Sequence, residues 1–311
     1  MKMMVLARDA ETYASLLEGK LPEAVTLTVC SRVRDAKSLV GACEVILGQP
    51  DLVRWILDDA KRLKWVQSTF AGVDALCQPQ FRKNYRLTGL KGIFGPLMSE
   101  YVMGHIIAWE RRLFDVRENQ RQKAWEPFES RSLKDLTIGL LGLGSIGEHV
   151  AKTAACFGMR SIGYRRSGRP SSAVEKVFNG DGFHDFLGDS DYVVSTLPAT
   201  PETKHLVNAD AFAAMKRSGV FINAGRGSTL CEADLISALE RKEIAGAVLD
   251  VFEKEPLPAE SPLWEMEEVV ITPHTAAISY PKDIVGIFLK NLSAYLAGES
   301  LSHEVDLGRG Y

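Results

Sequence analysis

Residues 137–148 read Thr-Ile-Gly-Leu-Leu-Gly-Leu-Gly-Ser-Ile-Gly-Glu and pass directly from a strand pattern into a helix pattern. Gly142, Gly144 and Gly147 have the spacing GxGxxG, which allows a tight turn, close approach of a pyrophosphate to the backbone and close packing of helix on strand. The free N–H groups at the start of the helix would face the phosphates. Because a second strand is predicted at 160–164, the segment indicates a Rossmann dinucleotide site rather than a glycine-rich turn that only packs tightly.

Short apolar strands alternate with helical segments on both sides of this turn. After it, strands are predicted at 160–164, 192–196, 220–223, 247–250 and 269–271; before it, at 3–7, 25–29, 45–47, 64–68 and 86–88. Nearly continuous Val, Ile and Leu is typical of parallel strands covered on both faces. We therefore expect an α/β protein in which a doubly wound, parallel-sheet Rossmann domain is inserted into a smaller flavodoxin-like α/β substrate domain.

The domain limits follow from the two ends of the second strand series. Helical spacing without a turn cluster predicts one long helix from Pro96 to about Lys123, and an amphipathic helix is predicted over 281–296. No strand is predicted after that last helix, so we expect it to pack on the first domain. The prediction is a discontinuous substrate domain, 1–98 and 281–311, around a nucleotide domain, 99–280.

Composition excludes several classes of partner. The chain has 311 residues, 46% of them apolar, and a formal net charge of −3, which gives no general attraction to nucleic acid or anionic membranes. The first apolar run is too short for a signal peptide. Five cysteines are scattered without CxxC spacing, which predicts reduced, mostly buried thiols in a cytoplasmic protein and no metal site.

The end of the second Rossmann strand indicates which dinucleotide is bound. Residues 163–169 read Gly-Tyr-Arg-Arg-Ser-Gly-Arg, with no acidic residue at the strand tip. Arg165, Arg166 and Ser167 instead offer donors suited to a 2′-phosphate. The sequence therefore predicts NADP(H), with NAD(H) bound more weakly. The alternative is a solvated turn in an NAD-binding protein.

Five further segments carry a family resemblance, at 197–203, 221–227, 249–258, 261–264 and 271–274. In this order, with the glycine loop, they resemble the D-isomer specific 2-hydroxyacid dehydrogenase family over nearly the whole chain. The arginine-rich turn and the segments 275–281 and 305–311 are most similar to the NADPH-dependent glyoxylate/hydroxypyruvate reductase A branch. The resemblance implies reduction of small 2-oxo acids to 2-hydroxy acids.

The resemblance also implies a catalytic set, Arg226, Glu255 and His274. In such a reduction His274 would donate a proton, since imidazole titrates near neutrality, and Glu255 would orient the ring and raise its pKa. Arg226 would bind the carboxylate and carbonyl oxygens of the substrate together with His274. Each residue alone has an ordinary structural explanation. Because all three follow strands of one Rossmann unit, we expect them to meet at the carboxyl edge of the sheet.

Further contacts are implied for both ligands. The loop Ala71, Gly72 and Val73 follows a strand, is expected to open a helix, and would hold the substrate carboxylate with its N–H groups. Trp264 and Tyr280 flank the histidine, and core packing is the favoured interpretation of both. The expected cofactor contacts are Gly142, Gly144, Ser145, Ile146, Gly147, Arg165, Arg166, Ser167, Pro198, Thr203, Ala224, Gly225 and Asp250.

Two rival functions and one assembly state accompany this prediction. A formate-type dehydrogenase of the same superfamily resembles this pattern but has Gln where Glu255 stands, which argues against it. A dinucleotide-sensing binding protein would keep the fold without turnover. Family members are commonly homodimers joined through the nucleotide domain, and the predicted long helix with Trp125 is the expected contact.

Overall fold

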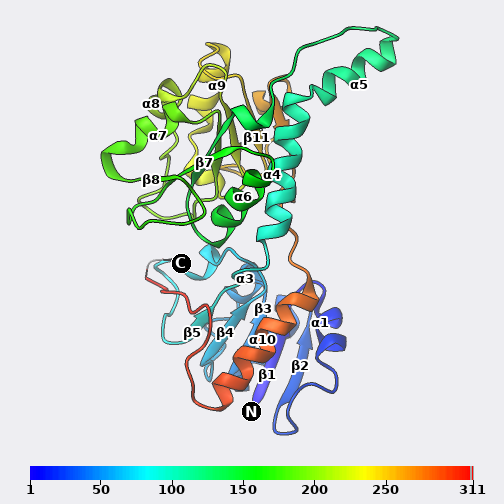
Figure 1. Cartoon of the computed structure of the whole chain (residues 1–311). Helices are drawn as coiled ribbons and strands as arrows, with labels where there is room; N and C mark the ends of the chain where they lie inside the picture. Colours follow the sequence, from blue (N-terminus) through cyan, green and yellow to red (C-terminus); the bar gives the residue numbers. More distant parts are fainter. Residues whose placement is uncertain (309, 311) are drawn as a thin grey trace. The chain divides into compact units, whose positions relative to one another are not determined.

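The structure is a computed structural model that describes residues 1–308 and 310. The chain forms two compact units: unit 1 comprises residues 1–93 and the segment from Ser279 onward, and unit 2 comprises residues 94–278 (Figure 1). The domain limits predicted from sequence, 98/99 and 280/281, stay a prediction beside this division.

Unit 1 contains a five-stranded parallel sheet in the order β2-β1-β3-β4-β5, the flavodoxin-like arrangement. The helix α10 lies beside α1, and Phe288 of α10 stacks on Trp65 of β4 with ring centroids 5.4 Å apart. Unit 1 therefore joins the first 93 residues to the last helix of the chain. Its elements are β1 (Lys2–Leu6), α1 (Ala10–Leu17), β2 (Thr26–Cys30), α2 (Val33–Lys37), β3 (Val45–Gly48), α3 (Pro50–Val53), β4 (Trp65–Ser68), β5 (Arg86–Thr88) and α10 (Pro281–Leu296).

Unit 2 contains a seven-stranded parallel sheet in the order β12-β11-β10-β9-β6-β7-β8. The strand order reverses beside β6, as in doubly wound Rossmann folds. Its strands are β6 (Thr137–Leu141), β7 (Arg160–Tyr164), β8 (Lys176–Phe178), β9 (Tyr192–Ser195), β10 (Val220–Asn223), β11 (Gly246–Leu249) and β12 (Val269–Ile271). Its helices are α4 (Gly95–Glu110), α5 (Leu113–Gln122), α6 (Ser145–Cys156), α7 (Phe183–Asp189), α8 (Ala209–Ala214) and α9 (Glu232–Glu240).

Helices cover both faces of the unit 2 sheet (Figure 1). Along β6, Leu141 joins a buried cluster with α7, α8 and α9, whereas Leu140 joins another with α4 and α6. This two-sided burial explains the nearly uninterrupted apolar strands. The predicted fold class is confirmed. The short edge strand β8 was not predicted.

The helix expected to run from Pro96 to Lys123 is interrupted, so that prediction was wrong. The helix α4 ends at Glu110, and α5 begins at Leu113 after Arg112, whose backbone lies in the left-handed region (φ 47°). Glu110 is buried, whereas no residue of α5 is buried. The break therefore falls where the packed part of the helix ends.

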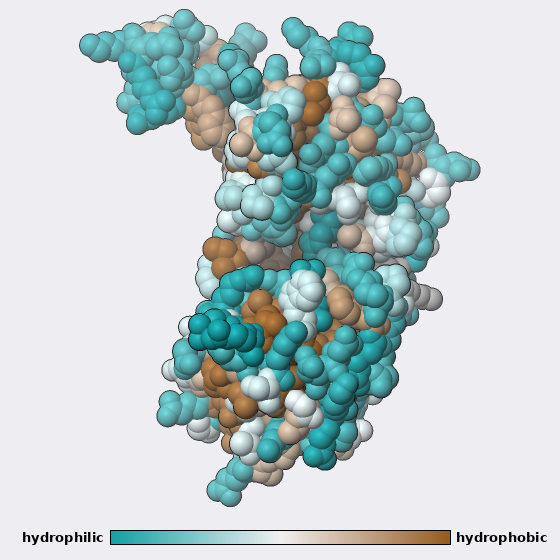
Figure 2. Space-filling model, turned by 180° about the vertical axis from the view of Figure 1, so that it is seen from behind, coloured by the Kyte–Doolittle hydropathy of each residue, from teal (hydrophilic) through white to brown (hydrophobic). Residues whose placement is uncertain are grey.

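The structure also shows the character of the surface and the burial of the five cysteines. Among the described residues, no helix has the length and apolarity needed to cross a membrane. The segment that contains α5 projects from unit 2 (Figure 1), and Figure 2 shows that its surface is mainly hydrophilic, with apolar atoms near its base. Cys30 and Cys43 are buried, but Cys77 and Cys231 are partly exposed and Cys156 is exposed, so the prediction of mostly buried thiols was wrong.

Candidate active site

The predicted nucleotide and catalytic residues of unit 2 follow five of its seven strands, at the carboxyl edge of the sheet. Gly142 follows β6, Arg165 follows β7, and Arg226 follows β10. Glu255 comes after β11 and His274 after β12. Ligands of open α/β sheets bind at this edge.

The turn after β6 has the shape that a phosphate group requires. Gly142 has φ +104°, and a Cβ on Gly147 would collide with the carbonyl oxygen of Gly142. Around Gly144 the space is open, so a ligand can approach the backbone there. Gly144 is also the N-cap of α6 and supplies no side-chain cap, which leaves the N–H groups of the first turn, at Ser145 and Ile146, suited to an anion.

Arg165 lies at the tip of β7 in an unexpected pairing. Its Nη2 is 2.9 Å from Oε1 of Glu148, and the Ser171 hydroxyl donates to the same oxygen at 2.8 Å. The hydrogen bond from Ser171 and the Arg165 charge lower the pKa of Glu148 against the opposing effect of its burial. Arg165 is 16% exposed, and its Nε is buried with no partner in the described part of the chain. An orphaned donor at this position fits a phosphate-bearing ligand.

The other residues of this turn are more open. Arg166 is mostly exposed and lies 4.0 Å from Glu202, while the Ser167 hydroxyl accepts from the backbone N–H of Arg169 at 3.4 Å. Glu148 was missed by sequence reasoning because it comes from α6 and not from the strand tip. Its position in the first turn after the glycine loop was the available signal.

His274 and Glu255 form a direct pair. Nδ1 of His274 is 2.8 Å from Oε2 of Glu255, whose Oε1 accepts from the Phe252 N–H at 3.1 Å. The hydrogen bond that His274 donates to Glu255 raises the pKa of His274, although partial burial and the Arg226 charge oppose it. Burial alone would raise the pKa of Glu255, but the bonds from His274 and Phe252 and the nearby positive charges lower it. The pair thus favours an imidazolium beside a carboxylate.

The backbone of His274 is held in a strained conformation. Its φ is 55°, in the left-handed region that costs a non-glycine residue about 1–3 kcal/mol. Its N–H donates to the carbonyl of Asp250 at 2.9 Å. The Asp250 carboxylate, 2% exposed, accepts from the Thr272 hydroxyl at 2.6 Å and from the N–H groups of Thr275 at 2.8 Å and Ala276 at 2.9 Å. Asp250 therefore holds the turn that presents His274.

Two residues of this support were missed from the sequence, Thr272 and Tyr101. The Tyr101 hydroxyl, on α4, lies 2.7 Å from Oγ1 of Thr272, and burial raises the pKa of Tyr101 well above its ordinary value. The phenol thus stays neutral and available for hydrogen bonding. Tyr101 lies in a helix pattern far from the motif segments, so no local pattern predicts this contact.

Arg226 lies between two glycines that close packing requires. A Cβ on Gly227 would overlap the backbone of Phe252, and one on Gly225 would press on the backbone of Leu197. The Arg226 carbonyl accepts from Oγ1 of Thr229 at 2.7 Å and Nδ2 of Asn223 at 3.2 Å. Its charge opposes the rise in the pKa of His274 and contributes to the lowered pKa of Glu255. The guanidinium therefore acts electrostatically on the same pair.

The remaining predicted cofactor residues of unit 2 lie at the ends of β9 and β10. Oγ1 of Thr203 donates to the carbonyl of Pro198 at 2.7 Å and accepts from the N–H of Thr200 at 2.9 Å, which closes this segment into a compact turn. Ala224 is 8% exposed and donates its N–H to the Ser195 carbonyl at 3.1 Å. Their cofactor contacts stay a prediction.

The predicted substrate loop belongs to unit 1. Ala71 is exposed, Gly72 is half-buried, and the side chain of Val73 lies in the unit 1 core. The loop opens only a three-residue 3-10 helix, Asp74–Leu76, so the prediction of a following helix was wrong. Its role in substrate binding stays a prediction.

The two flanking aromatic residues also differ from expectation. Trp264 is 52% exposed and Tyr280 is 48% exposed, so core packing was the wrong interpretation of both. The Trp264 indole N–H donates to the carbonyl of Pro258 at 2.9 Å, which holds the ring at the surface of unit 2.

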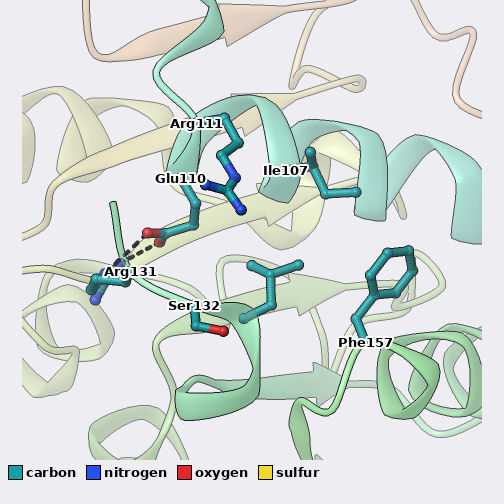
Figure 3. A pocket seen from close by; sticks show the side chains of 7 residues that line it. Ile107, Glu110, Arg111, Arg131, Ser132 and Phe157 are labelled. Carbon is teal, nitrogen blue, oxygen red and sulfur yellow. Dashed lines mark hydrogen bonds and ion pairs between the residues drawn. The ribbon is translucent and has the colours of Figure 1, made fainter. Parts of the chain in front are cut away.

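A cavity of about 290 Å³ lies at the opposite, amino edge of the unit 2 sheet (Figure 3). Glu110 and Arg131 form an ion pair there, and the hydroxyl of Tyr192, which opens β9, donates to Glu110 at 2.6 Å. The cavity marks the base of the projecting segment and not the site described above. Its lining comprises Ile107, Glu110, Arg111, Arg131, Ser132, Leu133 and Phe157.

Comparison with known proteins places this geometry in a family. Residues 103–276 match the model of the D-isomer specific 2-hydroxyacid dehydrogenase, NAD binding domain. The chain belongs to the D-isomer specific 2-hydroxyacid dehydrogenase family. The family resemblance inferred from the motifs is thereby confirmed. The curated relatives of this dehydrogenase include glyoxylate/hydroxypyruvate reductase A of Salmonella paratyphi B, 31% identical over 320 residues and covering 97% of each chain.

Two solved structures resemble the dehydrogenase along its whole length. A D-isomer specific 2-hydroxyacid dehydrogenase family protein from Aeromonas salmonicida is 40% identical, with a TM-score of 0.93 and coverage of 98% of this chain and 99% of that one. The NADPH-dependent glyoxylate/hydroxypyruvate reductase of Sinorhizobium meliloti, in complex with NADP and sulfate, is 30% identical, with a TM-score of 0.87 and coverage of 100% and 99%.

Proposed function

We propose that this dehydrogenase reduces small 2-oxo acids, with glyoxylate and hydroxypyruvate as substrates, to D-2-hydroxy acids at the expense of NADPH. The observation that carries the proposal is the pair of His274 and Glu255 beside the charge of Arg226, at the sheet edge that also holds the glycine loop. The names of the Salmonella and Sinorhizobium relatives agree with this substrate class.

His274 is the proposed proton donor. Its Nδ1 is engaged by Glu255, which leaves Nε2 as the nitrogen that would face the carbonyl oxygen of the substrate. As negative charge develops on that oxygen, an imidazolium delivers the proton and stabilises the charge. Glu255 keeps the ring oriented and protonated.

Arg226 is the proposed anchor for the substrate carboxylate and carbonyl oxygens. A planar guanidinium can donate two parallel hydrogen bonds to such a pair of oxygens. The tight backbone packing of Gly225 and Gly227 limits movement of the arginine backbone. Ligands with adjacent carboxylate and carbonyl oxygens, as 2-oxo acids have, are therefore the ones that this arrangement favours.

NADPH is the proposed cofactor, and it supplies the hydride when bound. The glycine loop and the uncapped start of α6 would hold its pyrophosphate, and Arg165, with Arg166 and Ser167, would hold the 2′-phosphate. Pairing with Glu148 offsets part of the positive charge of Arg165. We therefore expect NADPH to be preferred while NADH still supports slow turnover.

The test is a spectrophotometric panel of 2-oxo acids with NADPH and with NADH. We expect kcat/KM for glyoxylate or hydroxypyruvate with NADPH to exceed every value with NADH. Binding of NADPH without turnover on any 2-oxo acid would point to a sensing protein. Oxidation of formate in place of 2-oxo acid reduction would identify the other rival enzyme.

We also propose a homodimer joined through the arm, which we define as residues 111–131. The helix α5 in this arm has no buried residue, and Trp125 is 95% exposed. Leu113, Phe114 and Phe128 add exposed apolar surface on the same segment. Apolar side chains without cover on a projecting segment are typical of an interface. Sedimentation of the full chain and of Trp125→Ser tests this, with loss of the dimer expected in the variant.

A further inference from the structure

A second cluster of chemically reactive side chains lies in unit 2 apart from the His274 pair. His205, Cys231 and Glu253 each offer a ligand atom, and these atoms all lie within 4.8 Å of one another. Nε2 of His205 is 3.0 Å from Oε1 of Glu253. The three residues come from different segments, after β9, before α9 and after β11. The fold therefore gathers donors that the sequence keeps far apart.

Backbone hydrogen bonds fix the first two members. The N–H of His205 donates to the Ser228 carbonyl at 2.9 Å, and the N–H of Cys231 donates to the Val207 carbonyl at 2.9 Å. A bridge between Val207 and Leu230 joins the same two segments. The two backbone segments that carry the imidazole and the thiol are thus held together by hydrogen bonds.

Glu253 is fixed by a reciprocal arrangement with Glu232. The N–H of Glu253 donates to Oε1 of Glu232 at 2.6 Å, and the N–H of Glu232 donates to Oε1 of Glu253 at 3.4 Å. Hydrogen bonds to a ligating carboxylate orient it for a metal. Oε1 of Glu253, the oxygen that lies near Nε2 of His205, is thus the one that accepts from Glu232.

The donor set selects the kind of ion. Nitrogen of His, sulfur of Cys and oxygen of a carboxylate are the ligands that Zn²⁺ takes, at bond lengths of about 2.0–2.3 Å. Such bonds in a tetrahedron place neighbouring ligand atoms about 3.3–3.8 Å apart, so small side-chain rotations from the present arrangement suffice. Mg²⁺ and Ca²⁺ prefer oxygen ligands alone.

We propose that His205, Cys231 and Glu253 bind one Zn²⁺ ion, with water in the fourth position. The ion would tie together the segment after β9, which contains Thr203, and the segment after β11, which contains Glu255. It would act as a clamp on the loops of the active site and take no part in proton transfer. The sequence did not predict this site because its ligands are 26 and 22 residues apart, without the close spacing of common metal motifs.

Cobalt(II) titration of the full, chelator-treated chain tests the site, because a thiolate ligand gives Co²⁺ a charge-transfer band in the near ultraviolet. We expect one Co²⁺ per chain with this band, and its loss when Zn²⁺ is added. Cys231→Ser should abolish the band, and His205→Gln should weaken Co²⁺ binding at least tenfold. Cys156→Ser, which changes an exposed cysteine outside the cluster, is the matched control and should bind as the parent does.

A measurement on the unaltered chain accompanies the variants. Alkylation followed by mass spectrometry should show that Zn²⁺ protects Cys231 while Cys156 still reacts. Unprotected Cys231, a cobalt complex without the band, or a band that survives Cys231→Ser would overturn the proposal. Because His205 and Glu253 are exposed, His205→Gln and Glu253→Gln should fold and test the site even if Cys231→Ser does not.

Discussion

Asp250→Asn tests whether the buried carboxylate holds His274 in its strained position. The carboxylate accepts three hydrogen bonds from the turn 272–276. Oδ1 accepts from Thr272 and Thr275, and Oδ2 accepts from Ala276. An amide has one acceptor oxygen, so at least one N–H or hydroxyl of the turn must lose its partner. The substitution leaves the side-chain volume nearly unchanged, but it replaces one acceptor oxygen with an NH2 donor and removes the charge.

The free-energy cost of Asp250→Asn can be compared with the backbone strain at His274. One buried donor left unsatisfied costs about 1–3 kcal/mol, and hydrogen bonds to a charged group contribute about 1.5–3 kcal/mol. The left-handed backbone of His274 costs about 1–3 kcal/mol. The two quantities are of the same size, so the turn should relax and displace the imidazole. We expect the free energy of unfolding to fall by about 1–3 kcal/mol and kcat to fall at least tenfold.

Chemical denaturation, steady-state kinetics and NADPH titration by fluorescence measure the three effects. Asp189→Asn, a change at an exposed site on α7, is the matched control and should stay within about 0.5 kcal/mol of the parent. An unchanged unfolding free energy with kcat within threefold of the parent would refute the reasoning. A loss confined to NADPH affinity would also refute it, because Asp250 would then act on the cofactor and not on the turn.

Three further predictions concern other parts of the site. The Glu255 hydrogen bond raises the pKa of His274 and the reduction needs the imidazolium, so the rate should decline as pH rises through that pKa. In Glu255→Gln the decline should move to lower pH, and pH profiles that superimpose would contradict this. Arg165→Asp should lower kcat/KM with NADPH about tenfold or more, which is the effect of one lost charged hydrogen bond, and should leave kcat/KM with NADH unchanged. Equal losses with both cofactors would contradict a role of Arg165 in binding the 2′-phosphate. Gly227→Ala should lower the free energy of unfolding by about 1–3 kcal/mol or more through overpacking against Phe252. Gly104→Ala, where a Cβ has open space, is its control and should not destabilise; similar thermal shifts in both variants would argue against backbone contact as the cause.

The fold class followed from local patterns because the strands are buried on both faces and therefore read as apolar runs. Elements with little burial were not predicted. One example is β8, which has three residues at the sheet edge, with only Phe178 buried. The break after Glu110 contains neither Gly nor Pro, and it depends on where tertiary packing stops. Exposure of Trp264 likewise depends on its neighbours in space.

The site residues at the ends of strands were predictable from the sequence, but the residues that hold them in place were not. The glycine loop, Arg226 and His274 stand in recognisable segments, and the family that those segments suggested is confirmed. The pairing of Arg165 with Glu148 joins two elements 17 residues apart, and Tyr101 reaches Thr272 across 171 residues. Such contacts depend on the folded sheet, so local spacing does not reveal them.

The exposed helix α5 has a consequence for handling the protein. Ten residues without a buried face cannot hold a helix by themselves in water, since isolated helices shorter than about 12–15 residues are marginal. Its order must therefore come from whatever covers it, and in a dimer that cover disappears on dilution. Protease sensitivity of residues 113–122 should rise as the protein concentration falls, while the sheet of unit 2 stays protected.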